Sequence, residues 1–316
     1  MSIDREEIKG LIRGPSVIMM LPFKDNYELN IEALKENIQF IIDGGISTGK
    51  GIIICPCGTG EYVTLSPEEH KMVVKATVEA AGDNLPVVAG VPSNDYRQVI
   101  ELSKEAAKAG AICVMVPPPY YYPVSQEDLY RWYKLIAEEL SGIIGVMAYN
   151  QAWRNSGTFI SVPLMGRLAG IENMVSMKYG GEVMTDYITT LTLYSKRFAF
   201  IDNTFAYTSS LGHIHGHAGY ITAPGVFWPE FEAEYWSLLE QHKYTEADKF
   251  HAKQGPLWQM YCERGNGIFG ASIFKAGQEY RGLYGGPVRP PFTVLTKEQK
   301  KKLFDIFEGM GVPKKR

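Results

Sequence analysis

The chain has little cysteine and no hydrophobic run of membrane length. Only four of its 316 residues are cysteine, at positions 55, 57, 113 and 262. That is too few for the disulfide framework of a small secreted domain, and it favours a reduced setting. No apolar stretch approaches the roughly 20 residues of a membrane span, and the charged start lacks the apolar core of a signal peptide. We therefore expect a cytoplasmic protein with no membrane partner.

An excess of charge of one sign is also absent. Lysine and arginine number 32 against 35 aspartates and glutamates, which gives a net charge of −3. A chain with this balance lacks the basic surface that nucleic acid binding requires, so we expect no nucleic acid partner. The composition, 45% hydrophobic and 21% charged, is that of a globular protein with ample material for a core.

Short apolar runs alternate with helix-like segments along the first two thirds of the chain. Eight such runs read as strands, at residues 16–22, 51–55, 86–90, 111–116, 142–149, 173–178, 197–201 and 216–222. This alternation indicates parallel pairing through helical crossovers, and eight units fit a closed (β/α)8 TIM barrel of the α/β class. An open doubly wound sheet is the competing architecture. It should carry a glycine-rich phosphate fingerprint in an early turn, and none is present.

Helices are expected between these strands and, alone, after Phe227. The expected segments are 30–43, one opened by Ser66, 94–109 with Asn94 as cap and Gly110 as stop, 125–140, 162–169, 182–194, 204–211, 229–241, 244–261, 267–280 and 296–310. The pattern predicts a barrel with the active site in residues 1–228. Residues 229–316 are expected to form a C-terminal helical appendage.

A lone lysine, Lys178, stands where a mostly apolar strand gives way to a glycine turn. If the strand is paired, Met174, Ser176 and Lys178 share one face, which is either solvent or barrel interior. In the first case Lys178 is an ordinary surface residue. In the second its amine is held out of water, which disfavours the charged form, and a neutral amine attacks a ketone to form a Schiff base.

Other strand ends also carry polar residues, where a TIM barrel keeps its working groups. After strand two, Gly58 and Gly60 flank Thr59, so backbone N–H groups and a hydroxyl could meet an anion; a tight turn is the simpler interpretation. Tyr149 ends strand five, and a phenol beside an amine can pass a proton either way.

Metal chemistry finds less support. His213, His215 and His217 alternate before strand eight, but spacing supplies no converging carboxylate or cysteine partners. Cys55 and Cys57 form a lone C-x-C, too little for zinc. We expect no metal site, and we interpret the histidines as packed loop residues near a subunit contact.

Taken together, these segments resemble the dihydrodipicolinate synthase / N-acetylneuraminate lyase family. The matching stretches are the strand-two loop with Thr64–His70, Pro119-Tyr120-Tyr121, Tyr149-Asn150, Lys178 and Gly216–Thr222, in the right order over nearly the whole chain. The resemblance implies a lyase that needs no cofactor, because Lys178 itself forms the Schiff base with pyruvate or a longer 2-oxo acid. It also implies a homo-oligomer, a dimer or tetramer.

The same resemblance implies roles for individual residues. Tyr149 would transfer the proton, Thr59 with nearby backbone would hold the substrate carboxylate, and Arg154 would meet a second carboxylate at the mouth. Tyr121, or Tyr122 one residue later, would be lent across a subunit interface. Gly219 and Ile221 would line the pocket through their backbone.

Gly58 departs from the family pattern, since many relatives have a hydroxyl residue there in a tyrosine–hydroxyl–tyrosine relay. Gly58-Thr59-Gly60-Glu61 and Gly286–Phe292 look like the branch of 5-dehydro-4-deoxyglucarate dehydratase, whereas Gln151–Gly157 is closer to the synthases and lyases. We favour aldolase or lyase chemistry, with dehydration as the alternative. A barrel that binds a small acid without turnover is a third hypothesis.

Overall fold

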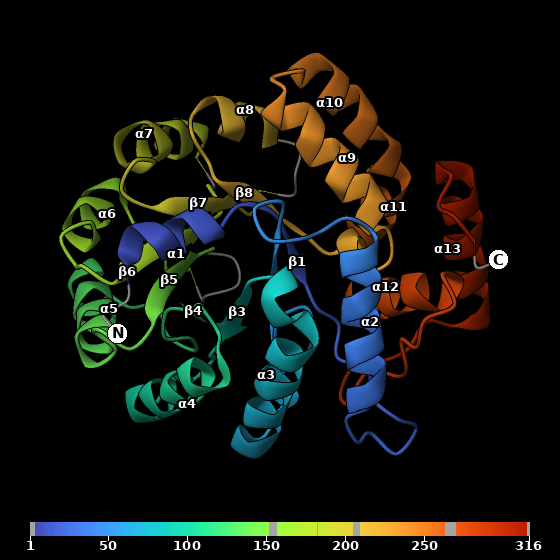
Figure 1. Cartoon of the computed structure of the whole chain (residues 1–316), viewed down its shortest axis with the longest axis horizontal. Coiled ribbons are helices and arrows are strands. Elements are labelled where there is room, and N and C mark those ends of the chain that lie inside the picture. The colour runs from blue at the N-terminus through green and yellow to red at the C-terminus, as the bar shows by residue number, and fades with distance from the viewer. Residues whose placement is uncertain (1–3, 152–156, 182, 205–208, 263–269, 315–316) are drawn as a thin grey trace.

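Eight parallel strands close into a barrel in the computed structural model (Figure 1), which describes residues 4–151, 157–181, 183–204, 209–262 and 270–314. The strands are β1 (Gly14–Ile18), β2 (Ile52–Ile54), β3 (Val87–Gly90), β4 (Cys113–Val116), β5 (Gly145–Asn150), β6 (Met174–Tyr179), β7 (Ala199–Asp202) and β8 (Gly219–Thr222). Each strand pairs with the next in sequence, and β8 pairs back with β1. The predicted (β/α)8 architecture is confirmed.

The strands are buried along their lengths because helices cover the outside and side chains fill the inside. Nearly every strand position is buried, including all three residues of β2 and all six of β6. Strands buried on both faces read as continuous apolar runs, and this is why the sequence shows runs of isoleucine and valine with few polar interruptions.

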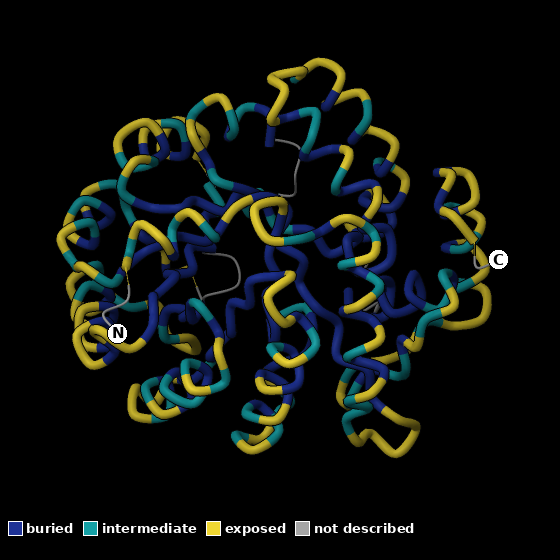
Figure 2. The backbone as a smooth tube through the Cα atoms, in the orientation of Figure 1, coloured by how far each residue is buried: buried dark blue, intermediate teal, exposed yellow. Residues whose placement is uncertain are grey.

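A ring of helices surrounds the barrel, as the dark inner tube and lighter outer turns of Figure 2 show. The ring helices are α2 (Ile31–Asp43), α3 (Pro67–Ala81), α4 (Tyr96–Ala109), α5 (Gln126–Glu139), α6 (Val162–Leu168), α7 (Met184–Tyr194), α8 (Ser209–Ile214) and α9 (Pro229–Glu240). Ser66 caps α3 in a capping box with Glu69, as the sequence predicts. The cap of α4 is Asp95 and not Asn94, whose amide instead bonds the backbone of Tyr120.

One helix was not predicted. Helix α1 (Arg5–Leu11) begins at Asp4, whose carboxylate accepts from the N–H of Glu6. It contacts β6, and Ile8 lies beside Gly145 at the first residue of β5. A helix at the starts of the strands leaves the other end of the barrel, where the strands finish, for the site.

The C-terminal helices pack on the barrel through one continuous core. They are α10 (Tyr244–His251), α11 (Gly255–Cys262), α12 (Gly270–Tyr280) and α13 (Lys297–Met310). The single helix expected over 244–261 is two helices, joined by a short 3-10 turn. Helix α9 contacts β1 and takes the eighth place in the ring (Figure 1), so the boundary expected at residue 228 separates a barrel helix from its barrel.

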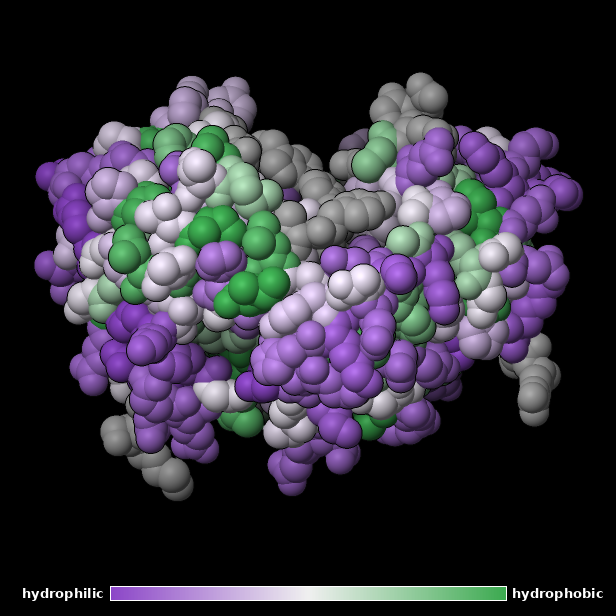
Figure 3. All heavy atoms as spheres, turned by 90° about the horizontal axis from the view of Figure 1, so that it is seen from above, coloured by the Kyte–Doolittle hydropathy of each residue, from purple (hydrophilic) through white to green (hydrophobic). Residues whose placement is uncertain are grey.

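The surface is polar over much of the face in Figure 3, with most of its hydrophobic side chains left of the centre and smaller groups elsewhere. Most ion pairs join exposed side chains, such as Lys71 with Glu101. Such pairs contribute at most about 1 kcal/mol each, so the fold depends on its core instead. Within the described ranges, no helix combines the length and apolar character that crossing a bilayer would need.

Candidate active site

Lys178 lies inside the mouth of the barrel. It is the fifth residue of β6, pairs in register with Tyr149 and Ile201, and its side chain is only 5% exposed. Its Nζ lies 4.3 Å from the centre of the Tyr149 ring. Lys178 therefore points to the interior face, which is the arrangement that Schiff-base chemistry requires.

Lys178 and Tyr149 line a cavity that is partly open to solvent. Its lining combines residues from strand ends with three aromatic residues from the C-terminal helices: Ile18, Thr59, Tyr149, Gln151, Lys178, Asn203, Ile221, Ala223, Trp258, Tyr261 and Phe274. Four residues predicted from the sequence, Thr59, Tyr149, Lys178 and Ile221, thus meet in one cavity. They come from β2, β5, β6 and β8, which are brought together only when the barrel closes.

The hydroxyl of Tyr149 donates a hydrogen bond to Oε1 of Gln151. The backbone at Tyr149 is also tied to helix α5, because its N–H donates to the Tyr133 hydroxyl at 3.4 Å. Gln151 was not predicted as a site residue. It directly follows β5, so the rule that polar residues at strand ends face the mouth could have found it, and the same holds for Asn203 after β7.

The loop after β2 is packed tightly around Thr59. A Cβ at Gly60 would lie 1.9 Å from the carbonyl oxygen of Met19, so no other residue fits there. A Cβ at Gly58 would lie 3.7 Å from the ring of Tyr62. That is an ordinary van der Waals distance, so the space at Gly58 would accept a Cβ next to the Tyr62 ring.

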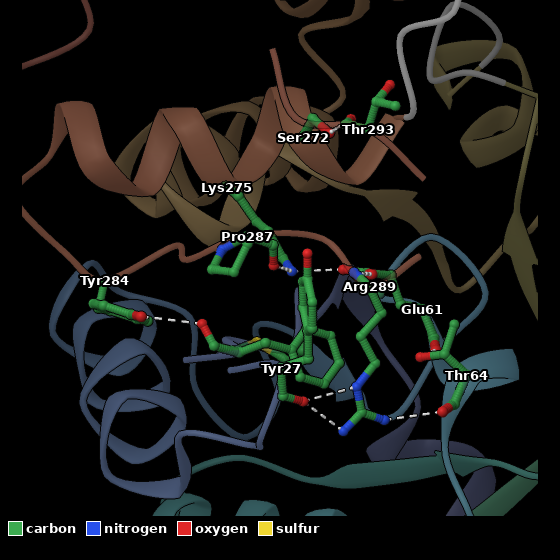
Figure 4. A network of polar contacts seen from close by, with 12 residues as sticks. Tyr27, Glu61, Thr64, Ser272, Lys275, Tyr284, Pro287, Arg289 and Thr293 are labelled. Carbon is green, nitrogen blue, oxygen red and sulfur yellow. Dashed lines mark hydrogen bonds and ion pairs between the residues drawn. The ribbon is translucent and has the colours of Figure 1, made fainter. Parts of the chain in front are cut away.

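A buried ion network holds this loop from outside the cavity (Figure 4). Glu61 has a left-handed backbone (φ 72°), and its fully buried carboxylate lies 2.5 Å from Nζ of Lys275 on α12. Lys275 also donates to the carbonyl of Pro287 at 2.6 Å. Burial lowers the pKa of Lys275 to about 8, with Glu61 opposing the shift.

Arg289 completes the network. Its backbone N–H donates to the second carboxylate oxygen of Glu61 at 2.7 Å. Its guanidinium donates to the carbonyls of Tyr27 and Thr64 and pairs with the carboxylate of Glu69, at 3.0 Å for one N–H···O contact. Pairing with Arg289 lowers the pKa of Glu69. The loop around Thr59 is therefore tied to α3 and to the C-terminal region.

Four other predicted residues are not among those that line this cavity: Gly58, Gly60, Tyr121 and Gly219. Gly219 is at the start of β8, where a Cβ would lie 2.0 Å from the carbonyl oxygen of Gly14, so close strand packing accounts for it. Tyr121 is 76% exposed and packs edge-on against the 70% exposed Tyr122. Arg154 falls outside the residues that the structure describes.

The histidines before β8 belong to the packing of the opposite end of the barrel. His217 is buried, and its ring lies 5.8 Å from that of His213, which in turn packs on Trp236 at 5.5 Å. Burial lowers the pKa of His217 to about 3, so the ring is neutral at ordinary pH. In the described part of the chain, no group of three histidine, cysteine, aspartate or glutamate residues is placed to hold a metal ion.

The barrel is shared with known proteins. A model of the dihydrodipicolinate synthetase family matches residues 11–309. The chain is 30% identical to a 4-hydroxy-tetrahydrodipicolinate synthase of Methanothrix thermoacetophila over 95% of this chain and 98% of that protein. It is 32% identical to an uncharacterized DapA-like lyase of Thermococcus kodakarensis, covering 92% and 97%.

Solved structures agree with these sequence relatives. The dihydrodipicolinate synthase of Aquifex aeolicus superimposes with a TM-score of 0.85 at 26% identity, covering 96% of this chain and all of that one. The chloride-inhibited enzyme of Acinetobacter baumannii in complex with pyruvate gives the same TM-score, identity and coverage. Since the family match, the relatives and the fold agree over nearly the whole length, the chain belongs to the dihydrodipicolinate synthetase family of lyases.

Proposed function

We propose that the protein catalyses Schiff-base chemistry on pyruvate or a longer 2-oxo acid through Lys178, with aldol bond formation or cleavage as the outcome. The observation that carries this proposal is the position of Lys178, buried at the end of β6 under the ring of Tyr149 in the same cavity as Thr59. A pyruvate complex is known for the Acinetobacter baumannii relative, which supports the choice of 2-oxo acid.

The proposed steps use residues of this cavity alone. The neutral amine of Lys178 attacks C2 of the 2-oxo acid, and loss of water leaves an iminium whose positive nitrogen acidifies the C3 protons. Tyr149 accepts or returns a proton, while Thr59 holds the carboxylate. The enamine then attacks an aldehyde carbon, and water releases the product from the lysine. The lysine nitrogen is the electron sink, so we propose that neither metal nor cofactor is needed.

Reductive trapping tests this proposal directly. Borohydride added with pyruvate should fix a covalent adduct on the peptide that contains Lys178, as read by mass spectrometry. Lys275 is the internal control, because it is also buried and burial lowers its pKa to about 8, yet it is not among the residues that line this cavity. An adduct on Lys275, or none at all, would remove the mechanism.

Dehydration of a 2-oxo sugar acid is the second candidate. The two stretches that look like the dehydratase branch, residues 58–61 and 286–292, are in direct contact through Glu61 and Arg289. They form one structural unit behind the Thr59 loop, and neither Glu61 nor Arg289 lines the cavity. Because the two stretches contact each other, their resemblance to the dehydratase branch counts as a single observation. It concerns residues that support the Thr59 loop and not residues that line the cavity.

One substrate, a 4-hydroxy-2-oxo acid, distinguishes aldol cleavage, dehydration and binding without turnover. A 4-hydroxy-2-oxo acid should give pyruvate and an aldehyde by cleavage, whereas dehydration removes only its C4 hydroxyl. Exchange of the C3 protons of pyruvate in deuterated water would show turnover without any second substrate. Protein that neither exchanges these protons nor cleaves the acid would favour the binding barrel.

We also propose that the protein assembles as a homo-oligomer through the loop that holds Tyr121. Tyr120, Tyr121 and Tyr122 expose 43%, 76% and 70% of their surface, and three large exposed aromatic residues in sequence are typical of a contact surface. Sedimentation of the wild type against a Tyr121→Ala, Tyr122→Ala variant measures this. Equal molecular masses at the size of one chain would contradict it.

A further inference from the structure

We infer that the second substrate is an aldehyde with a planar, apolar substituent, of the benzaldehyde class, received by an aromatic wall that Trp258, Tyr261 and Phe274 form. This inference rests on the proposed function, and it adds the chemistry of the partner that the enamine attacks. In the cleavage direction, the matching substrate is a 4-hydroxy-2-oxo acid whose C4 carries the aryl group.

The three side chains form one surface. Trp258 and Tyr261 are three residues apart on α11, so they share a face of the helix, and their rings lie 5.6 Å apart. The ring of Phe274 on α12 lies 5.6 Å from that of Tyr261. All three are buried, with exposures of 7%, 5% and 1%, and all three line the cavity that holds Lys178.

The wall and the reactive groups enter the cavity from different parts of the molecule. Lys178 and Tyr149 come from β6 and β5, whereas α12 contacts the short 3-10 turn Pro224–Val226, which in turn contacts β1. In a barrel with strands in sequential order, β1 is diametrically opposite β5. The aromatic wall therefore faces the proton-transferring phenol across the mouth.

The wall is built from aromatic rings, and its indole donor is already engaged. The indole N–H of Trp258 donates to Oε1 of Gln254 at 3.2 Å. Gln254 directly precedes α11. The carboxyamide of Gln254 is held in turn by the buried Glu232 at 2.9 Å, so this donor is fixed away from a ligand. A carboxylate against the faces of Trp258 and Phe274 would lose its water without a charged partner on those rings, whereas an aryl group stacks on them.

The reaction balances without any further reagent. C3 of the enamine forms a bond to the aldehyde carbon, and the aldehyde oxygen takes up a proton to become the C4 hydroxyl. Water then adds to the iminium and releases a 4-hydroxy-4-aryl-2-oxo acid with Lys178 regenerated. No electron leaves or enters the system, and the aryl ring stays intact.

Substrate preference of the wild-type enzyme is the first test. With pyruvate fixed, kcat/KM should be roughly 100-fold higher for benzaldehyde than for aspartate semialdehyde or glyceraldehyde. A preference for aspartate semialdehyde would support the role that the family resemblance gives to Arg154 and overturn the aromatic inference. Trapping of pyruvate on Lys178, measured in the same samples, shows whether the proposed function itself holds; without trapping, both fall.

A matched pair of variants locates the preference. Trp258→Leu should reduce the benzaldehyde to aspartate semialdehyde ratio at least about tenfold. Trp236→Leu makes the same change at a buried tryptophan packed against Arg13 and His217, away from the cavity, and should keep the ratio. The ratio does not depend on the folded fraction. Should Trp258→Leu not fold, Phe274→Leu replaces it, and an unchanged ratio there would overturn the inference.

Discussion

Two lysines of this protein are almost equally buried, yet their surroundings differ completely. Lys178 has an exposure of 5% and Lys275 of 2%. Lys275 lies against the carboxylate of Glu61, donates to a backbone carbonyl and is 4.7 Å from the centre of the Phe23 ring. Lys178 lies under the ring of Tyr149 and borders a cavity.

Burial alone therefore does not decide the role of a lysine. A buried lysine that is matched with a carboxylate and an acceptor is fixed in place, and its charge is compensated. A buried lysine that borders a cavity has room for a reacting carbon beside its nitrogen. Lys275 is of the first kind and supports the site. Lys178 is of the second kind, and we propose that it carries out the chemistry.

Removal of the Lys178 amine should have the largest effect. Lys178→Met should lower kcat by at least about 10⁴-fold, because no other group in the cavity replaces the covalent step. The variant should fold with unchanged or higher thermal stability, since an apolar side chain suits a buried position. Steady-state kinetics and a thermal melt measure both effects. Turnover within tenfold of wild type would end the distinction between the two lysines.

Loss of the phenol should come second. Tyr149→Phe keeps the ring over Lys178 but removes the hydroxyl that bonds Gln151, and kcat should fall by about 10²- to 10⁴-fold. Trapping of pyruvate on Lys178 should survive as a slower reaction. Gln151→Glu is a useful companion, because it keeps an acceptor for the phenol. A Tyr149→Phe enzyme with wild-type C3 proton exchange would assign the proton transfer elsewhere.

The sequence identifies the reactive side of the cavity because strand ends are local features. Lys178, Tyr149 and Thr59 each follow an apolar run and precede a turn, so the barrel topology alone brings them together. The aromatic wall has no such signal. Trp258 and Phe274 lie on helices far along the chain, and no local pattern there indicates which surface those helices cover.

The exact ends of helices are also hard to predict from the sequence. Asn94 and Asp95 are both good cap residues, so the pattern alone does not choose between them. Gly255 and Pro256 mark the start of α11. Proline in the first turn is typical of a helix start, and the single helix expected over 244–261 does not use this signal. Helix α1 has only seven residues, and its stability comes from contact with the barrel, which no local pattern records.

Breaking the Lys275 pair should cost stability more than chemistry. Lys275→Met leaves the Glu61 carboxylate buried without its cation, and the free energy of unfolding should fall by about 3–5 kcal/mol. Chemical denaturation measures this loss. The double variant Glu61→Gln, Lys275→Met should recover a good part of it, because no unpaired charge remains. If the single and double variants were equally unstable, packing and not charge would explain the loss.

The smallest effect concerns a third buried base, His217, which has neither a carboxylate beside it nor a cavity. Neither of its ring nitrogens has a hydrogen-bond partner among the described residues, and burial lowers its pKa from 6.5 to about 3. As pH falls below 6.5, the unfolded chain takes up a proton there and the folded protein does not. This single group should therefore reduce the free energy of unfolding by about 1.4 kcal/mol per pH unit between roughly pH 6 and 4.

His217→Phe should remove that part of the slope, as measured by denaturation at several pH values. Trp236→Phe changes the same cluster without a titrating group, so it should shift the stability equally at each pH and keep the slope. Parallel curves for wild type and His217→Phe would show that His217 takes up its proton in the folded state as well.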